Sequence, residues 1–325
     1  MSGRAGQPSR RDVLRGAAGL SVLALAPRRA RAAASQPATA PSFDVPPGSC
    51  DCHVHVIGDP KRYTMVPDRA YTPPPASVDE LVALQHALHL DRVVVVQPSF
   101  YGTDNRCLLD ALQALGPRAR GIAVIDDDTT DRELDALHKA GVRGVRLNLE
   151  TTGQADADAA RVKFWAAAAR VSGRGWHVQC YTRLSVVAAL SDILGSLPVP
   201  VVLDHFAGAR PSDGEAGLSK LYALLRGDNV YVKLSAPYRL SQQPDYADMA
   251  PLARALVETR ADRLVWGSDW PHTSAVRPPG SSIDTVSPFT PIDDGASLNR
   301  LAAWVPDAAT RHRILVDTPA HLYGF

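Results

Sequence analysis

The feature that most constrains the fold of this 325-residue chain is a regular alternation of short β-branched runs with longer segments rich in alanine and leucine. The strand candidates are residues 50–56, 92–97, 119–125, 143–148, 176–181, 199–205, 229–235 and 263–268. The helix candidates are residues 78–90, 106–115, 131–140, 155–172, 184–194, 217–226, 248–259, 297–304 and 307–316. Continuous apolar strands that alternate with helices indicate a parallel sheet covered on both faces.

Eight strand–helix units in a chain of this length predict an α/β fold, a single-domain (β/α)8 TIM barrel over residues 49–325. A doubly wound open sheet is the alternative. No Gly-x-Gly-x-x-Gly follows the first strand, so the nucleotide-binding form of that sheet lacks support. In a barrel, chemistry lies at the carboxyl ends of the strands and in the loops after them.

The first 32 residues are not expected to belong to the fold. Residues 9–14 contain two adjacent arginines, a weakly apolar run follows over 16–26, and small residues flank an arginine at 30–32. This pattern resembles a bacterial twin-arginine export signal, which predicts a periplasmic protein. A disordered basic tail is the alternative. Residues 33–48 have the composition of a Pro/Ala-rich linker.

Composition excludes several classes of partner. The chain is 45% hydrophobic and 21% charged, as is ordinary for a globular protein, and no run after the leader is apolar enough to insert into a membrane. Residues 1–32 hold seven arginines and one acidic residue, so cleavage there leaves 28 basic and 33 acidic residues, a net charge of −5. A mildly acidic protein is a poor candidate for nucleic-acid binding. An oligomer is possible, and the four cysteines are expected to be buried small side chains.

Almost every predicted strand delivers a polar or ionisable side chain to the same rim. A barrel with a purely structural role would not need this, so the coincidence is more specific than any single motif. The rim residues are His53 and His55, Ser99, Arg146 and Asn148, Tyr181 and Arg183, His205, Arg239, and Asp269 and His272.

Four of these strand ends carry a family resemblance. The motifs are Asp51-Cys52-His53-Val54-His55, Gly144-Val145-Arg146-Leu147-Asn148, Val202-Leu203-Asp204-His205 and Trp266-Gly267-Ser268-Asp269-Trp270-Pro271-His272. Over residues 48–325 the chain resembles the amidohydrolase superfamily. Within it, the chain is similar to the branch of pyrone-dicarboxylate lactonases and related lactone hydrolases. The resemblance implies a hydrolase that opens a cyclic ester.

One departure bears on the cofactor. Metal-dependent amidohydrolases place a histidine at the end of strand five, where this chain has Tyr181, and strand four ends in Arg146 and Asn148 rather than a lysine that could be carboxylated. A binuclear centre is therefore not expected. The resemblance to lactonases that work without metal favours a site with no cofactor. A single Zn²⁺ is the alternative, and its ligands would be His53, His55, His205 and Asp269.

Each rim residue has an expected role in lactone hydrolysis. Asp269 is the candidate general base, with loop capping as the structural alternative. His53, His55 and His205 are expected to polarise the lactone carbonyl. Tyr181 could donate to a substrate carboxylate or carbonyl, or pack against a helix.

Three arginines suggest an anionic substrate. Arg binds carboxylates through two parallel contacts, so Arg146, Arg183 and Arg239 predict a small carboxylated lactone. A surface salt bridge is an equal alternative for Arg183. The further polar contacts expected are Ser99, Asn148 and His272.

Two other functions stay open at this point. One is a zinc-dependent decarboxylase or amidase on the same scaffold, and the other is a non-catalytic periplasmic protein that binds organic anions. The long Pro/Gly/Ser-rich segment 277–295 is a candidate lid over the mouth, or an insertion with no role.

Overall fold

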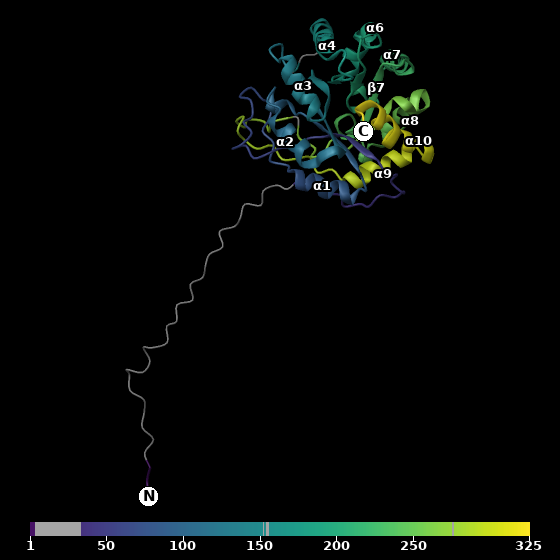
Figure 1. The fold of residues 1–325 in the computed structure, drawn as a ribbon. Coiled ribbons are helices and arrows are strands. Elements are labelled where there is room, and N and C mark those ends of the chain that lie inside the picture. Colours follow the sequence, from purple (N-terminus) through teal and green to yellow (C-terminus); the bar gives the residue numbers. More distant parts are fainter. Residues whose placement is uncertain (4–33, 152, 154–155, 275) are drawn as a thin grey trace. The chain divides into compact units, whose positions relative to one another are not determined.

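The computed structural model describes residues 1–3, 34–151, 153, 156–274 and 276–325, and residues 32–325 form one compact unit. Eight parallel strands lie at the centre of that unit, each paired with the next along the chain (Figure 1). The strands are β1 (Cys50–Val54), β2 (Arg92–Val96), β3 (Ala119–Ala123), β4 (Val142–Asn148), β5 (His177–Tyr181), β6 (Val201–Leu203), β7 (Val230–Ser235) and β8 (Leu264–Gly267).

The sheet closes where β8 meets β1. The Asp269 amide donates to the His53 carbonyl at 2.9 Å, and the His55 amide donates to the Trp270 carbonyl at 2.8 Å. Gly267 permits this approach, because a Cβ there would lie 2.8 Å from the Cβ of His53. The predicted (β/α)8 barrel is confirmed, and the open-sheet alternative is wrong.

Helices surround the barrel (Figure 1). The α-helices are α1 (Val78–Ala87), α2 (Arg106–Leu115), α3 (Asp131–Lys139), α4 (Ala157–Val171), α5 (Leu184–Ala189), α6 (Ser191–Leu194), α7 (Glu215–Arg226), α8 (Ala250–Arg260), α9 (Asp294–Trp304), α10 (Ala308–His312) and α11 (Thr318–Tyr323). Short 3-10 helices are η1 (Ser99–Tyr101), η2 (Gly116–Arg118), η3 (His205–Gly208), η4 (Pro237–Arg239), η5 (Pro244–Met249) and η6 (Ala261–Arg263), and η7 (Arg313–Asp317) is a π-helix.

Two helical segments differ from the sequence prediction. The pattern over 184–194 forms two helices, α5 and α6, that meet at Leu190. The pattern over 307–316 continues through η7 and α11 to Tyr323. The wider turn of a π-helix shifts the phase of the buried positions, so a search for a 3.6-residue period loses the helix there.

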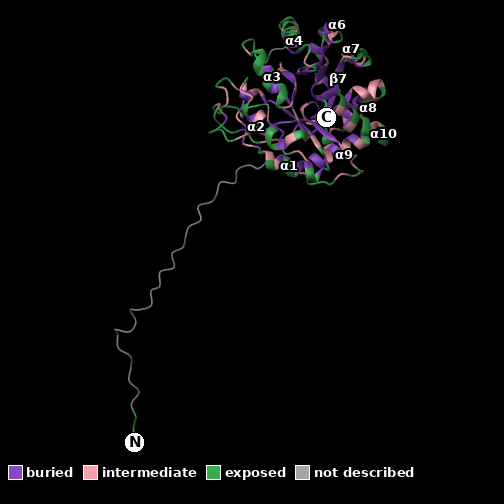
Figure 2. Ribbon diagram, in the orientation of Figure 1, coloured by how far each residue is buried: buried purple, intermediate pink, exposed green. Residues whose placement is uncertain are grey.

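Burial follows the layers of the barrel (Figure 2). The main apolar core lies between the strands and the helices, and a smaller cluster joins strand residues such as Val94 and Val265 to Tyr323 of α11. Tyr231 belongs to that smaller cluster. Because strand side chains alternate, Lys233 and Ser235 share its face and lie nearer the carboxyl end of β7.

The segment that precedes β1 packs on the barrel instead of spanning open solvent. Ala34 is buried, the indole of Trp270 donates to the Ser35 carbonyl at 2.9 Å, and Thr39 donates to Asp293 at 2.5 Å. Residues 34–48, which the composition suggested as a linker, therefore make specific contacts. Most of the predicted export signal, residues 4–32, lies outside the described residues.

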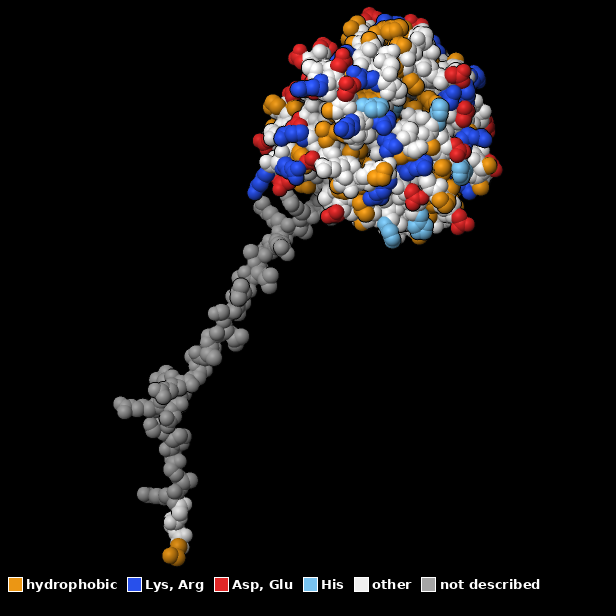
Figure 3. All heavy atoms as spheres, viewed as in Figure 1, with side chains coloured by type: hydrophobic (Ala, Val, Ile, Leu, Met, Phe, Trp, Pro, Cys, Tyr) orange, Lys and Arg blue, Asp and Glu red, His pale blue; other side chains and the backbone are white. Residues whose placement is uncertain are grey.

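Two observations on the described residues concern membranes and surface charge. Among the described residues, no helix combines the length and apolar character needed to cross a bilayer. Basic and acidic side chains are interspersed over the face seen in Figure 3. All four cysteines are buried and unpaired, as expected.

Candidate active site

Four of the predicted rim residues come together in a buried polar cluster at the carboxyl ends of the strands. His53, His55, His205 and Asp269 are each at most 5% exposed. His205 (φ 51°) and Asp269 (φ 67°) adopt left-handed backbone conformations, which cost free energy in residues other than glycine. Strained conformations of this kind cluster at functional sites, because the strand end must turn sharply to aim the side chain.

Asp269 is held as a carboxylate with one oxygen occupied and one available. Its Oδ2 accepts hydrogen bonds from the Tyr238 hydroxyl at 2.6 Å and from Arg239 Nε at 2.7 Å. Its Oδ1 accepts none from any described residue. Burial opposes the charge of Asp269, but the Arg239 guanidinium and the adjacent imidazoles hold its pKa well below the usual range. Asp269 is therefore anionic at neutral pH.

Three imidazole nitrogens face the available oxygen of Asp269. The distances from Oδ1 are 3.6 Å to Nε2 of His53, 3.8 Å to Nε2 of His55 and 3.8 Å to Nε2 of His205. Nε2 of His53 also lies 3.3 Å from Nε2 of His55. Four atoms with lone pairs or exchangeable protons thus converge on one point.

The hydrogen-bond partner of a ring nitrogen indicates whether that nitrogen carries the proton of the imidazole. Nδ1 of His55 lies 2.7 Å from the Val96 carbonyl, which can only accept, so the proton of this imidazole is on Nδ1. Nδ1 of His205 lies 2.8 Å from Oγ of Ser235, which can donate or accept. Burial lowers the pKa of His55 to about 3 and that of His205 to about 4. Both rings are neutral at pH 7, and His55 presents a lone pair at Nε2.

His53 has two competing partners below the cluster. Its Nδ1 lies 3.2 Å from Asp204 Oδ1 and 3.3 Å from Lys233 Nζ. Lys233 is wholly buried and donates to Oε1 of Gln179 at 2.7 Å and to the Cys52 carbonyl at 2.9 Å. Burial opposes the charge of Asp204, but Lys233 and His53 hold its pKa well below the usual range.

Sequence reasoning did not assign Asp204, Gln179, Lys233 or Tyr238 to the site. One signal was present for Lys233, because it is the only charged side chain within the apolar run of β7. A lysine in a strand buried on both faces needs a compensating anion, which a search for buried charges would seek. Tyr238 lies in the irregular η4 turn, where no sequence pattern indicates the direction of a side chain.

A small cavity lies above the cluster. Its volume is about 20 Å³, enough for roughly one water molecule. Tyr71 lies over it, with its hydroxyl 3.0 Å from Oγ1 of Thr273. The residues that line the cavity are His55, Tyr71, Pro98, Ser99, Arg146, Asn148, Thr151, Tyr181, His205, Arg239, Asp269 and Thr273. Most of the predicted substrate contacts are among them.

Two larger cavities adjoin the small one. A cavity of about 330 Å³ shares Arg146 and Asn148 with it, and a cavity of about 140 Å³ shares Tyr181 and Arg239. Nη1 of Arg146 donates to the Gln97 carbonyl, and Nη2 of Arg239 donates to the Thr273 carbonyl. Because a guanidinium has five N–H donors, both arginines keep further N–H groups that can bind an anion.

Two predicted contacts lie elsewhere. The side chain of Arg183 is 59% exposed and pairs with Glu150 at 2.8 Å, at the edge of the 140 Å³ cavity. His272 is buried and its Nε2 lies 2.9 Å from Asp294 Oδ1, so it does not line the small cavity. Glu150 is 33 residues from Arg183, a distance at which sequence alone could not identify the pair.

The loop predicted as a lid lies beside the roof of the cavity. The Ser287 amide donates to the Thr72 carbonyl at 2.8 Å, and the Thr72 hydroxyl donates to the Ile283 carbonyl at 2.5 Å. Arg69 pairs with Asp284 at 2.8 Å. The segment 283–287 therefore holds the loop that carries Tyr71.

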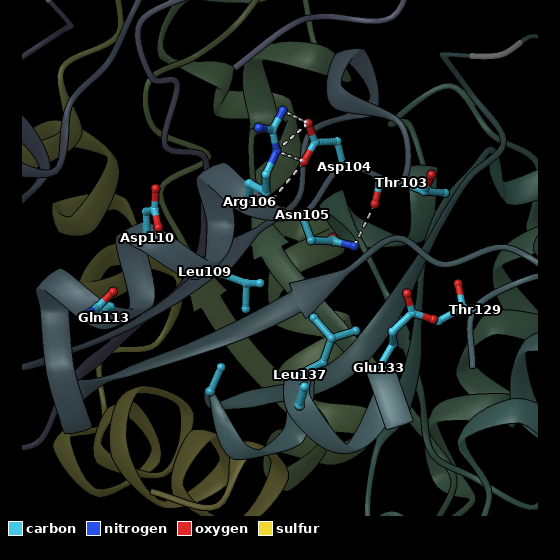
Figure 4. Close-up of a pocket in the computed structure, with 12 residues that line it drawn as sticks. Thr103, Asp104, Asn105, Arg106, Leu109, Asp110, Gln113, Thr129, Glu133 and Leu137 are labelled. Carbon is cyan, nitrogen blue, oxygen red and sulfur yellow. Dashed lines mark hydrogen bonds and ion pairs between the residues drawn. The ribbon is translucent and has the colours of Figure 1, made fainter. Parts of the chain in front are cut away.

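A cavity larger than these lies on the outside of the barrel. It has a volume of about 630 Å³ and lies between α2 and α3, lined by the apolar Leu109 and Leu137 and by the charged Asp104, Arg106 and Glu133 (Figure 4). None of the predicted site residues lines it. The predicted site residues therefore gather at the smaller cavity.

The buried cluster fits a single metal ion by its geometry. Tetrahedral zinc ligands about 2.1 Å from the ion lie about 3.4 Å from one another. The measured separations of 3.3 to 3.8 Å among Nε2 of His53, Nε2 of His55 and Oδ1 of Asp269 are close to that value. Two overlapping residue groups could hold an ion, His53–His55–Asp269 and His53–Asp204–His205.

Comparisons with known proteins agree with this architecture. The amidohydrolase family (Amidohydro_2) matches residues 50–325. A 2-pyrone-4,6-dicarboxylate hydrolase of Comamonas testosteroni is 35% identical over 297 residues, covering 87% of this chain and 92% of the relative. A 4-sulfomuconolactone hydrolase of Hydrogenophaga intermedia is 35% identical over 289 residues, covering 87% and 90%.

A solved structure is also similar. The crystal structure of a probable 2-pyrone-4,6-dicarboxylic acid hydrolase from Acinetobacter baumannii, with citric acid bound, superposes with a TM-score of 0.68 at 27% identity, covering 86% of this chain and all of the other. With a family match across the whole barrel and relatives above 30% identity, this chain belongs to the amidohydrolase family.

Proposed function

We propose that this protein hydrolyses the ring ester of a small carboxylated lactone. The observation that carries the proposal is the anionic Asp269, whose available oxygen faces three neutral imidazoles at a small, water-sized cavity. Relatives that are 35% identical carry the names of lactone hydrolases. Such a hydrolase needs a base for water and donors for the developing oxyanion.

Asp269 activates the water. A water molecule in the cavity donates to Oδ1, while Tyr238 and Arg239 fix the carboxylate through Oδ2. As the water oxygen bonds to the lactone carbonyl carbon, its proton passes to Oδ1. When the ring C–O bond breaks, the same proton passes to the leaving oxygen, which gives a carboxylic acid and a hydroxyl and restores Asp269. The new acid, which keeps the second proton of the water, then loses it to solvent and becomes a carboxylate.

The carbonyl oxygen requires donors, and the structure limits which residues can supply them. His55 cannot donate through Nε2, because its proton is used on the Val96 carbonyl. Donation therefore falls to Nε2–H of His53 and of His205, and to the hydroxyl of Tyr181. Burial raises the pKa of Tyr181, which keeps its hydroxyl protonated.

Two arginines can bind the carboxylate that the proposed substrate carries. Arg146 and Arg239 both line the catalytic cavity, and each also borders one of the two larger cavities. A substrate carboxylate in either space meets a guanidinium with unused N–H groups. Ser99 and Asn148 complete the polar lining.

The reaction as proposed requires no metal, although the site fits one. A zinc ion held by His53, His55, His205 and Asp269 would polarise the lactone carbonyl or acidify the water. The convergence of these ligands favours, as a second candidate, a zinc-dependent decarboxylase or amidase. Metal analysis of gently purified protein separates the two, because one tightly bound zinc per chain favours the second.

The test is a substrate panel with purified protein. Pyrone dicarboxylates, muconolactones and aldonolactones are incubated with the parent and with Asp269→Asn, and ring opening is followed. We expect turnover of at least one carboxylated lactone and loss of that turnover in the variant. No turnover of any lactone, or thermal stabilisation by the ligands without turnover, would contradict the proposal and favour a binding protein.

We also propose that the protein is exported to the periplasm through residues 1–32. The support is the pair of adjacent arginines followed by an apolar run. A reporter fused after residue 40 should reach the periplasm, and Arg10→Lys with Arg11→Lys should retain it in the cytoplasm. Equal export with and without the arginines would refute the twin-arginine route.

A further inference from the structure

The steps of the proposed reaction leave Lys233 without a role, although it is the most deeply buried cation near the site. Its side chain is 0% exposed, and its Nζ contacts the Cys52 carbonyl, Oε1 of Gln179, Oδ1 of Asp204 and Nδ1 of His53. Removing an ammonium group from water is expensive, and an apolar side chain of the same length would avoid that cost. A specific use for the charge is therefore expected.

Lys233 and Asp204 favour opposite tautomers of the His53 imidazole. When Nδ1 carries the proton, it donates to Asp204, and Nε2 presents a lone pair to the cavity. When Nε2 carries the proton, Nδ1 accepts from Lys233, and the ring donates into the cavity. The first tautomer is the one that a metal ligand needs. The second is the one that donates to a substrate oxygen or to Nε2 of His55.

The net charge around the cluster also disfavours a bound metal ion. Lys233, Arg146 and Arg239 bring three positive charges against the two negative charges of Asp204 and Asp269. The neutral imidazoles add nothing, so these five side chains together carry a net charge of +1 before any ion binds. A dication would raise this to +3 in a site with almost no exposure to water, where repulsion is weakly screened.

We propose that Lys233 keeps the catalytic centre free of divalent metal, by donating to Nδ1 of His53 and by adding a buried positive charge beneath it. Lys233 is thus a positioning residue: it acts on the reaction through the tautomer of His53. The inference rests on the proposed metal-free hydrolysis, which gives the reason why a metal should be excluded. Its evidence is independent, because metal binding and tautomers are measured without any substrate.

The first experiment compares the zinc affinity of folded variants. Isothermal titration with Zn²⁺ is performed on the parent, on Lys233→Met and on Lys139→Met, which removes the same charge from the exposed end of α3. We expect Lys233→Met to bind zinc about 10- to 100-fold more tightly than the parent, a range typical of changes in the outer shell of a metal site. Lys139→Met should match the parent.

Two further variants test whether the gain in zinc affinity arises at the histidine cluster. Adding His55→Gln to Lys233→Met should abolish the gained affinity, because it removes one of the converging nitrogens. Asp204→Asn should change affinity in the opposite direction, because it removes the carboxylate that stabilises a proton on Nδ1 of His53. Equal zinc affinity in folded Lys233→Met and parent, or stoichiometric zinc in the purified parent, would overturn the inference.

The second experiment needs only the parent protein. Nitrogen-15 NMR of histidine-labelled, metal-free protein reports which ring nitrogen carries the proton, and a His53→Gln spectrum assigns the signal. We expect His53 protonated on Nε2 and His55 protonated on Nδ1. A proton on Nδ1 of His53 would refute the role of Lys233 even if Lys233→Met failed to fold.

Discussion

Acidification should destabilise this protein through its buried neutral histidines. Burial lowers the pKa of His55 and His177 to about 3 and that of His205 to about 4, against about 6.5 in an unfolded chain. Below pH 6.5 the unfolded state binds protons that the native state does not. The stability linked to these rings is therefore present above pH 6.5 and is lost as pH falls toward 4.

The size of the effect follows from these values. Between pH 7 and pH 5 each of the three rings contributes a loss of about 1.9 kcal/mol, or nearly 6 kcal/mol together. Burial raises the pKa of Asp51 to about 7, so this carboxyl binds a proton in the native state and offsets about 2 kcal/mol of the loss. The expected net loss from these four groups, about 3 to 4 kcal/mol, is large beside a total stability of about 5 to 15 kcal/mol.

The assay is urea unfolding of the parent and of His177→Phe at pH 7, 6 and 5. His177 is a suitable reporter, because no described residue hydrogen-bonds either of its ring nitrogens and it packs against Tyr323, away from the catalytic cluster. The variant should lose less stability between pH 6 and pH 5, by about 1.2 kcal/mol. Stability that is flat or rising as the pH falls from 7 to 5, or equal slopes in the two proteins, would refute the reasoning.

Further predictions concern catalysis and access. Asp269→Asn should lower kcat by about 10²- to 10⁴-fold, the usual contribution of a general base, with an unchanged circular dichroism spectrum. Tyr238→Phe removes a donor to Oδ2, so the acid limb of the kcat/KM profile should move to higher pH; an unmoved limb would exclude this hydrogen bond as a control on Asp269. Arg239→Met should lose activity toward carboxylated lactones more than toward an uncharged lactone, and equal losses would exclude it as a substrate contact. A disulfide between Thr72→Cys and Val286→Cys, which form a β-bridge, should lower kcat/KM reversibly if the roof must open; full activity when oxidised would contradict this.

The sequence predicted the parts of this protein that follow from periodicity. Strand ends of a barrel share a rim, so His53, His55, His205 and Asp269 were identifiable from strand positions alone. Lys233 lies on β7 and Asp204 directly follows β6, but their importance depends on contacts across the barrel, such as that between Lys233 and Gln179, which are 54 residues apart.

Other features depend on long-range packing that local patterns do not record. The ion pair of Arg183 with Glu150 removes an arginine from the expected substrate contacts, and the bond of His272 to Asp294 does the same for a histidine. Residues 34–48 contain no periodic element, so nothing in their composition indicated that Thr39 would bind Asp293. These contacts are set by the tertiary fold.

The most direct test of the account is ring opening in water enriched in oxygen-18, with a lactone that the parent turns over. Attack by water held at Asp269 predicts one heavy oxygen in the new carboxylate of the product, and loss of that product with Asp269→Asn. A product without heavy oxygen in the carboxylate, or the parent's rate in Asp269→Asn, would contradict hydrolysis by Asp269-activated water.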